Sequence, residues 1–339
     1  MNSIETTSAF YQTQNYNPAD PLSAALPPSL SGIEVLALTS AAPAPTAHLA
    51  LVDGASATAS SATAESEGAW TLAAGGALPL NLHLTYQHGV TLIVELCGTD
   101  VANALEIALR IEVNDSVLEL ALSGKPAFTK RSWYLTPDLM HSGDNRITIK
   151  LPEGAPAPIR LKSVAVMRFN LQKQERKYWC WASVASGIHS FFEPAAVLTQ
   201  SQIVEACLGS TENKTLELAQ ALKKLGTLVC SHEAVPGLGE IRKQLSNGIP
   251  VPVRIGWTTE KDGRRVLNKR GHFIVITGVL QSDARGDDET LVRVADPAHD
   301  MASYMPYGIL KNGYNRNRGV LTHFYILKKQ DSAKTGGQS

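Results

Sequence analysis

The sequence has no excess of charge of either sign and no long apolar run. It contains 31 Lys and Arg and 31 Asp and Glu residues, so no net charge attracts it to nucleic acid or to a membrane surface. No apolar stretch approaches the roughly 20 residues that span a bilayer. Residues 1–20 lack the basic and apolar regions of a cleavable secretory signal. We expect a protein without nucleic-acid or membrane partners that is cytoplasmic, or exported by a route without a cleavable signal peptide.

Cysteine is scarce as well. The four cysteines are Cys97, Cys180, Cys207 and Cys230. No two of them form the Cys-x-x-Cys pair that binds zinc or performs thiol redox chemistry. The spacing requires no disulfide bond and leaves the redox state of Cys207 and Cys230 open. We therefore expect no metal and no cofactor.

Large apolar residues are also rare near the N-terminus. Residues 41–68 consist mainly of Ala, Ser and Thr, and such a composition buries too little surface to offset the entropy lost on ordering. A length of 339 residues suits two domains. The changes in pattern predict a flexible or low-complexity region at 1–75, a β-sandwich accessory domain at 76–170, a second domain at 171–328 and a disordered tail at 329–339.

Alternation of apolar and polar residues marks strands in the first predicted domain. It runs through LEIALRIEV at 105–113 and returns at 118–122 and 147–151, with turn residues between the runs. Several short strands of this kind predict an antiparallel β-sandwich. The segments RSWYLTPDLMHSGDNRITIKL and IRLKSVAVMRF resemble the last strands of galactose-binding-like jelly rolls. That resemblance implies an accessory module that binds a glycan or a protein.

The pattern becomes helical after Asn170 and returns to strands later. A helix is predicted from Cys180 to Pro194, and Thr199 with Gln202 forms a capping box that opens another helix through Leu208. Shorter helices are predicted around 218–225 and 241–245. Strands are predicted at VPVRIGW, HFIVITGVL, TLVRVADP and LTHFYIL. The second domain is therefore α+β, with helices packed on an antiparallel sheet.

Cys180 opens the first of these helices. A helix N-terminus favours a thiolate, because its unpaired N–H groups and the helix dipole face the sulfur. A cysteine between two tryptophans is equally typical of a buried structural thiol. The surrounding residues decide between the two interpretations. Gln174 lies six residues before Cys180, and Trp181 follows it directly.

This spacing resembles that of papain-like cysteine peptidases, in which a glutamine precedes the Cys-Trp pair by six residues. The resemblance implies that Cys180 is the nucleophile. It also implies that the Gln174 amide and the Cys180 backbone N–H donate hydrogen bonds to the oxyanion. Residues 177–179, Lys-Tyr-Trp, replace the Cys-Gly-Ser of plant papains.

The resemblance extends to the predicted base. Gly271-His272 leads into the strand FIVITGV, which is the setting of the catalytic histidine in this superfamily. His189 is about 13 Å from Cys180 along the predicted helix axis, too far to act as base. His232, His299 and His323 are formal alternatives to His272 that lack the Gly-His-strand context.

Asp296 is expected to orient His272. It ends the strand LVRVAD and precedes a proline, as in the branches similar to bacteriocin-processing and plant-pathogen effector peptidases, whereas plant papains have asparagine. An Asp-Pro pair that merely forms a turn is the alternative. The cluster KDGRRVLNKRGH before His272 could favour acidic substrates, but a solvated hairpin tip balanced by Asp283, Asp287, Asp288 and Glu289 is the simpler interpretation.

Three functions follow from these residues. The first is a cysteine endopeptidase with a Cys180-His272-Asp296 triad that cleaves proteins or peptides, as an effector or toxin or as a leader-peptide processing enzyme. The second is a glutamine deamidase or transglutaminase-like enzyme with the same residue types. The third is a non-enzymatic binding protein with an inactive peptidase fold. The sequence leaves open whether the N-terminal half inhibits the cleft.

Overall fold

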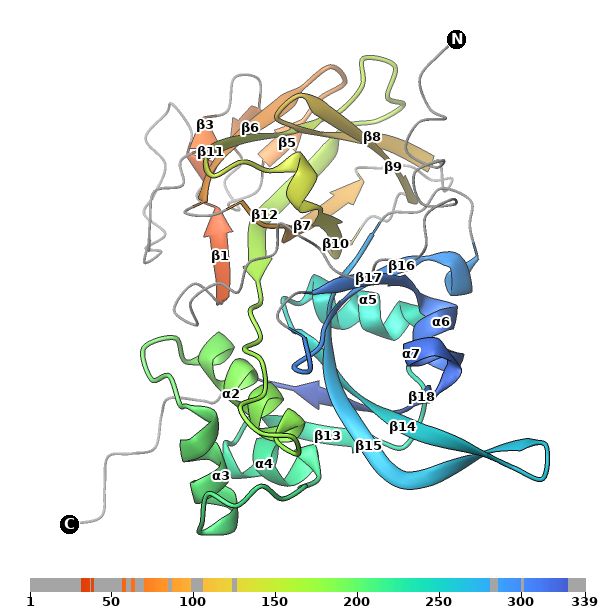
Figure 1. The fold of residues 1–339 in the computed structure, drawn as a ribbon. Coiled ribbons are helices and arrows are strands. Elements are labelled where there is room, and N and C mark those ends of the chain that lie inside the picture. Colours follow the sequence, from red (N-terminus) through yellow and green to blue (C-terminus); the bar gives the residue numbers. More distant parts are fainter. Residues whose placement is uncertain are drawn as a thin grey trace.

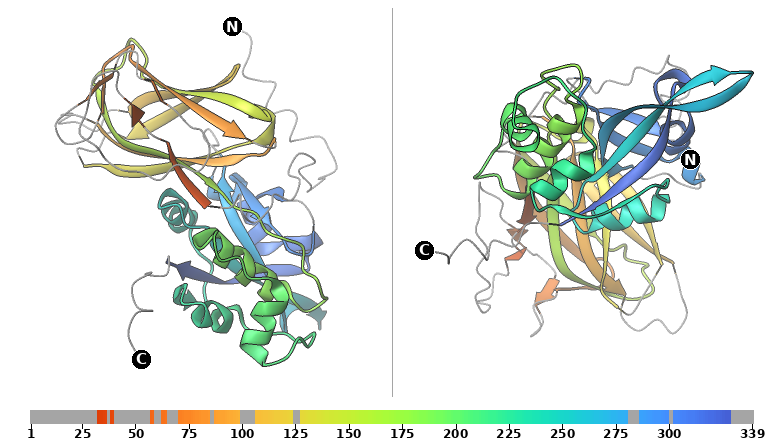
Figure 2. Two further views of the ribbon diagram at one scale, coloured as in Figure 1. Left: turned by 90° about the vertical axis from the view of Figure 1, so that its left-hand side faces the viewer. Right: turned by 90° about the horizontal axis from the view of Figure 1, so that it is seen from below.

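A β-sandwich and an α+β part make up the described structure. The computed structural model describes residues 70–84, 87–98, 106–123, 127–280, 286–299 and 302–328, with short strands at 32–36, 38–39, 57–58 and 62–64. In Figures 1 and 2 the sandwich lies against the part that carries the helices. The predicted fold class, an antiparallel β-sandwich followed by helices packed on an antiparallel sheet, is confirmed.

Two six-stranded sheets form the sandwich, and their pairings are antiparallel except between β2 and β3. The first has the order β10-β7-β12-β5-β4, with β1 also paired to β12. The second has the order β2-β3-β6-β11-β8-β9. The strands of the first sheet are β1 (Gly32–Leu36), β4 (Ala62–Ala64), β5 (Trp70–Leu72), β7 (Val90–Gly98), β10 (Thr129–Leu135) and β12 (Ile159–Arg168). Those of the second are β2 (Leu38–Thr39), β3 (Ala57–Thr58), β6 (Ala77–Leu84), β8 (Glu106–Val113), β9 (Ser116–Ser123) and β11 (Gly143–Lys150).

The predicted alternation is correct in this part of the chain. Ile107, Leu109 and Ile111 of β8 point into the core between the sheets, as the period of two requires. The predicted domain start at residue 76 stays a prediction, and Trp70 and Leu72 of β5, just before it, belong to the same core. Their apolar side chains follow a stretch of small residues too closely for composition to separate them. Most of the predicted flexible region, and all of the tail at 329–339, lie outside the described residues.

The second part contains the helices and a third six-stranded sheet of order β13-β18-β14-β15-β16-β17. Its helices are α2 (Cys180–Phe192), α3 (Gln200–Leu208), α4 (Leu218–Lys224), α5 (Leu238–Ser246), α6 (Tyr307–Asn312) and α7 (Tyr314–Asn317). Its strands are β13 (Leu228–His232), β14 (Val251–Lys261), β15 (Arg264–Val279), β16 (Leu291–Ala295), β17 (Ser303–Pro306) and β18 (Gly319–Leu327). No helix in the described ranges is long and apolar enough to cross a membrane.

The predicted helix boundaries rest on caps that the structure contains. The Thr199 hydroxyl accepts a hydrogen bond from Gln202 N, and the Gln202 side chain accepts one from Thr199 N, so the capping box is complete. At the other end, Gly209 adopts φ 70°, the left-handed conformation that glycine tolerates best. Helix α2 ends just before Pro194, as predicted.

Strand β15 is longer than predicted. The sequence indicates a strand from His272, but the strand begins at Arg264, and with β14 it forms a long hairpin that projects from the body (Figure 2, right). The turn is Asp262-Gly263, with φ of 53° and 67°. Both central residues of a type I′ hairpin turn require positive φ, which an Asp-Gly pair supplies. The arm is exposed on both faces, so its residues show no apolar alternation.

The sandwich and the α+β part share a core and polar contacts. Ile93 and Met167 of the sandwich belong to the apolar cluster of the α+β part. Thr91 Oγ1 donates to Thr277 O of β15 at 2.8 Å, which is buried. The Tyr134 ring packs so closely on Gly278 that a Cβ there would lie 2.6 Å from a ring carbon. The sandwich therefore supports the strand that also carries His272.

Replacing Gly278 by alanine should destabilise the protein by about 1 to 3 kcal/mol, because Tyr134 is wedged between Tyr304 and Arg293 and has little room to move. Urea unfolding measures the change. Gly154→Ala is the control, since no atom lies within 4 Å of its added Cβ. Equal stability of the two variants would show that the packing between the two parts is loose.

Candidate active site

Cys180 is the first residue of α2 and is buried. The tryptophans on either side of it fix this helix end. Trp179 Nε1 donates to Glu212 O at 2.9 Å, and Trp181 Nε1 donates to Lys214 O at 3.0 Å. Both indoles are fully buried, so each needs such a partner. The Trp-Cys-Trp sequence thus anchors the loop at 212–214 to the helix and holds the sulfur in place.

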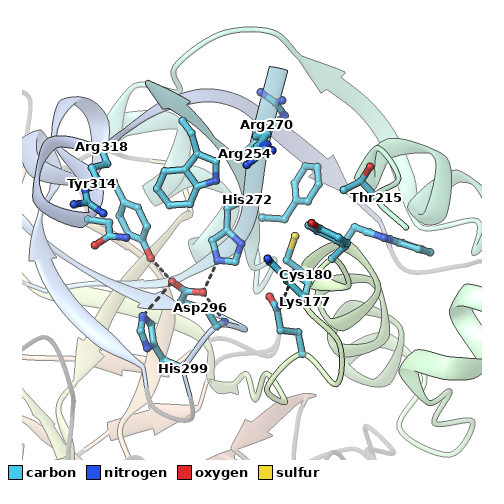
Figure 3. Close-up of a pocket in the computed structure, with 18 of the residues that line it drawn as sticks. Lys177, Cys180, Thr215, Arg254, Arg270, His272, Asp296, His299, Tyr314 and Arg318 are labelled. Atoms are coloured by element: carbon cyan, nitrogen blue, oxygen red, sulfur yellow. Dashed lines mark hydrogen bonds and ion pairs between the residues drawn. The ribbon is translucent and has the colours of Figure 1, made fainter. Parts of the chain in front are cut away.

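His272 faces Cys180 from β15. Its Nε2 lies 2.6 Å from Asp296 Oδ1, and Figure 3 shows the Cys180 sulfur beside the same ring. Burial lowers the pKa of His272, but hydrogen bonds and charge attraction with Asp296 and Cys180 outweigh burial and raise the pKa to about 10. The ring therefore holds a proton at neutral pH. Trp257 stacks beside it, with ring centroids 6.0 Å apart and planes inclined by 21°.

Asp296 lies just beyond the end of β16 and is buried. Its Oδ1 also accepts a hydrogen bond from Ala298 N at 2.8 Å, and its Oδ2 accepts one from the Tyr314 hydroxyl. Burial raises the pKa of this carboxyl, but the hydrogen bonds and the charge of His272 outweigh burial and lower it below its ordinary value. Asp296 is thus a carboxylate held from several sides, and it fixes the orientation of the imidazole.

Gln174 reaches the same groove in an orientation that the sequence does not reveal. Its Nε2 donates to Arg176 O at 2.9 Å and to Lys177 O at 2.8 Å, so both amide hydrogens are engaged within its own loop. Its backbone N–H donates to Pro297 O at 2.7 Å, next to Asp296. To bind an oxyanion, the amide must release one of its two carbonyl partners.

One open groove, with a volume of about 1840 Å³, is lined by all four predicted residues, Gln174, Cys180, His272 and Asp296. Of the other histidines, His299 also lines it, with Nε2 3.8 Å from Asp296 Oδ2. His189 instead pairs with Ala196 O at 2.8 Å. Sequence reasoning missed Tyr314 and Trp257. Nothing in their local sequence marks them, because both reach the site only through tertiary packing.

The described residues contain no group of three or more His, Cys, Asp or Glu side chains that could hold a metal ion. The chemistry available is that of a thiol, an imidazole and an oriented carboxylate in an open groove. This set can attack a carbonyl and transfer a proton to a leaving group.

The order and spacing of these residues can be compared with those of known protein families. Residues 163–309 match the family model of the papain-like cysteine protease AvrRpt2. The predicted resemblance to papain-like cysteine peptidases is confirmed, and the match supports a hydrolase of the peptidase class. The AvrRpt2 match begins within β12 of the sandwich and ends before Tyr314. No curated protein matches the chain significantly.

Among solved structures, several that match are carbohydrate-binding proteins. A family 35 carbohydrate-binding module from Clostridium thermocellum is 15% identical, with 27% of this chain and 70% of the module covered and a TM-score of 0.24. A ruminal GH26 endo-β-1,4-mannanase is 8% identical, with 34% of this chain and 21% of the mannanase covered and a TM-score of 0.24. This chain thus spans about a fifth of the mannanase. At such TM-scores the matches decide nothing about a ligand.

Replacing Asp296 by asparagine should lower the pKa of His272 from about 10, because the negative charge that favours the imidazolium is lost. An NMR titration of the His272 ring measures the shift. The control is Asp138→Asn, an exposed carboxylate of the sandwich. A His272 pKa that is the same in wild type and Asp296→Asn would show that Asp296 does not govern the ring.

Proposed function

We propose that the protein is a cysteine endopeptidase in which Cys180 is the nucleophile, His272 the general base and acid, and Asp296 the group that orients His272. The observation that carries the proposal is that His272 contacts Cys180 and Asp296 at once, in one open groove. The three residues come from a helix start, a strand centre and a strand end. These three residues lie far apart in the sequence, so only the tertiary fold brings them together.

The proposed reaction has two halves. The His272 imidazolium pairs with the Cys180 thiolate, and the thiolate attacks the carbonyl carbon of the scissile bond, so that a C–S bond forms and the carbonyl oxygen becomes an oxyanion. The His272 imidazolium then protonates the leaving amine, the C–N bond breaks, and a thioester remains on Cys180. In the second half His272 takes a proton from water, the hydroxide attacks the thioester, and the Cys180 thiolate leaves.

The Cys180 backbone N–H and the Gln174 amide are the proposed donors to the oxyanion. Cys180 N–H belongs to the first turn of α2, where backbone N–H groups have no partner within the helix. The Gln174 amide would exchange the carbonyl of residue 176 or 177 for the oxyanion as the intermediate forms. Donors of this kind act mainly on kcat, because the charge develops only in the transition state.

A glutamine deamidase or transglutaminase-like enzyme would use the same triad. The family match and the size of the groove favour a peptide substrate that passes through it. Mass spectrometry of a treated target separates the two reactions, since proteolysis creates new termini whereas deamidation leaves the chain intact. An effector or a leader-processing role, and a ligand of the sandwich, stay predictions.

Cys180→Ala should lower kcat/KM for peptide cleavage by about 10⁴-fold or more, because no other group can form the thioester. Cleavage of a random peptide library, read by mass spectrometry, measures it. Cys207→Ala is the matched control, because Cys207 lies on α3 outside the groove and burial raises the pKa of its thiol. Cleavage that survives in Cys180→Ala would refute the proposed nucleophile.

Gln174→Ala should lower kcat by about 10²- to 10³-fold and leave KM nearly unchanged if its amide binds the oxyanion. Steady-state kinetics and thermal unfolding are measured together. If the amide only holds the turn at residues 176–177, the variant would instead lose thermal stability while its kcat stays close to that of the wild type. That second result would remove Gln174 from the mechanism.

A further inference from the structure

The groove is strongly basic, although the chain as a whole is neutral. Six Lys and Arg residues besides Lys173 and Lys214 line it: Lys177, Arg254, Lys269, Arg270, Arg316 and Arg318. Among the described residues of the groove, the carboxylates are Glu217 and Asp296, and His272 already pairs with Asp296. Since the chain has equal numbers of acidic and basic residues, this excess is a local property of the groove.

The acidic loop that follows β15 does not balance this charge. Sequence reasoning set Asp287, Asp288 and Glu289 against the basic hairpin. None of these three lines the groove, and Asp288 pairs with Lys311 of α6 instead. Burial lowers the pKa of Arg242 in α5, while the charge of Asp287 raises it. Asp287 therefore lies close enough to α5 to interact with Arg242. The hairpin tip is exposed, as the simpler interpretation of the basic cluster requires. Lys269 and Arg270 of the same cluster line the groove, however, and Asp287, Asp288 and Glu289 do not offset their charge there.

Arg254 is the most firmly placed of the basic residues. Its side chain is only 13% exposed and packs over Gly271, where a Cβ would lie 2.7 Å from the guanidinium carbon. Its Nη1 donates to Thr322 Oγ1 at 3.3 Å. Gly271 directly precedes His272 on β15, and Arg254 and His272 line the same groove, in which Figure 3 shows them both. The Arg254 guanidinium can occupy this position because residue 271 is a glycine and has no side chain.

Arg254 has only a weak ion pair with the carboxylate of Glu217. Glu217 Oε2 is 3.9 Å from Arg254 Nε, beyond hydrogen-bond distance, and the Glu217 side chain is 58% exposed. A guanidinium presents a planar set of donors that matches a carboxylate. A partly buried guanidinium with such a weak partner can gain a short carboxylate contact from a substrate.

The far rim of the groove is also held in place. Asn315, Arg316 and Asn317 have φ of 48°, 57° and 64°, a left-handed run that is unfavourable for residues other than glycine. Arg265 of the hairpin arm stabilises it, since its Nη1 donates to Asn312 O at 2.8 Å and its Nη2 donates to Asn317 O at 2.7 Å. Arg316 is thereby kept on the rim of the groove.

We propose that the groove selects substrates with an acidic side chain in the segment that the groove binds, and that Arg254 is the specificity-determining residue that binds this carboxylate. The proposal rests on the proposed peptidase function and names its substrate class. The other basic residues attract the same substrates over a longer range, so binding weakens as salt is added.

A phage-displayed library of random peptides tests the proposal on the full chain carrying Cys180→Ala, which binds without cutting. Sequencing should show Asp and Glu enriched about tenfold or more over Asn and Gln at one position of the selected peptides, as expected for a charge-assisted hydrogen bond. Adding Arg254→Gln should abolish the enrichment. Adding Arg110→Gln, on the sandwich surface next to Glu119, should leave it unchanged.

Selection without acidic enrichment, or enrichment that survives Arg254→Gln, would overturn the proposal. The outcome is separate from that of the proposed function. If acidic peptides are selected in an Arg254-dependent manner but the wild-type protein cuts none of them, the groove binds acidic segments and the peptidase function fails. If peptides are cut without regard to acidic residues, the peptidase function stands and this inference fails.

Discussion

The buried hydrogen bond between His272 and Asp296 is the interaction on which the site depends. A buried imidazolium or carboxylate alone would be strongly unfavourable, and each is tolerated because the other lies 2.6 Å away. The Tyr314 hydroxyl and the Ala298 N–H complete the shell of the carboxylate. With one ring nitrogen bound to Asp296, the imidazole presents its other side to Cys180. The imidazole, which we propose to be the acid-base group, is therefore oriented before any substrate arrives.

The β-sandwich contributes to that orientation. Strand β15 carries His272 near its middle and, a few residues later, Thr277 and Gly278, which contact Thr91 and Tyr134 of the sandwich. Sandwich residues also join the apolar core of the α+β part. The shared packing makes the sandwich a support for the strand that holds His272.

Local patterns predicted the parts of the fold and site that depend on neighbouring residues. The capping box of α3, the alternation in β8 and the settings of Cys180 and His272 are of this kind. Tyr314 was not predicted because it contacts Asp296 only through tertiary packing, and the left-handed residues that follow it at 315–317 show no periodicity. The six-residue spacing predicted that Gln174 lies near Cys180, but it could not predict which way the Gln174 amide points. That direction is set by hydrogen bonds to two backbone carbonyls of the same loop.

Site-specific alkylation tests the central claim most directly, that His272 activates Cys180. Cys230 is a built-in comparison, because its Sγ lies 3.2 Å from His232 Nε2 on a more exposed strand. After brief treatment with a peptidyl chloromethyl ketone, peptide mapping should find the label on Cys180, and His272→Ala should abolish it. A label on Cys230 rather than Cys180, or a Cys180 label indifferent to His272→Ala, would contradict the account.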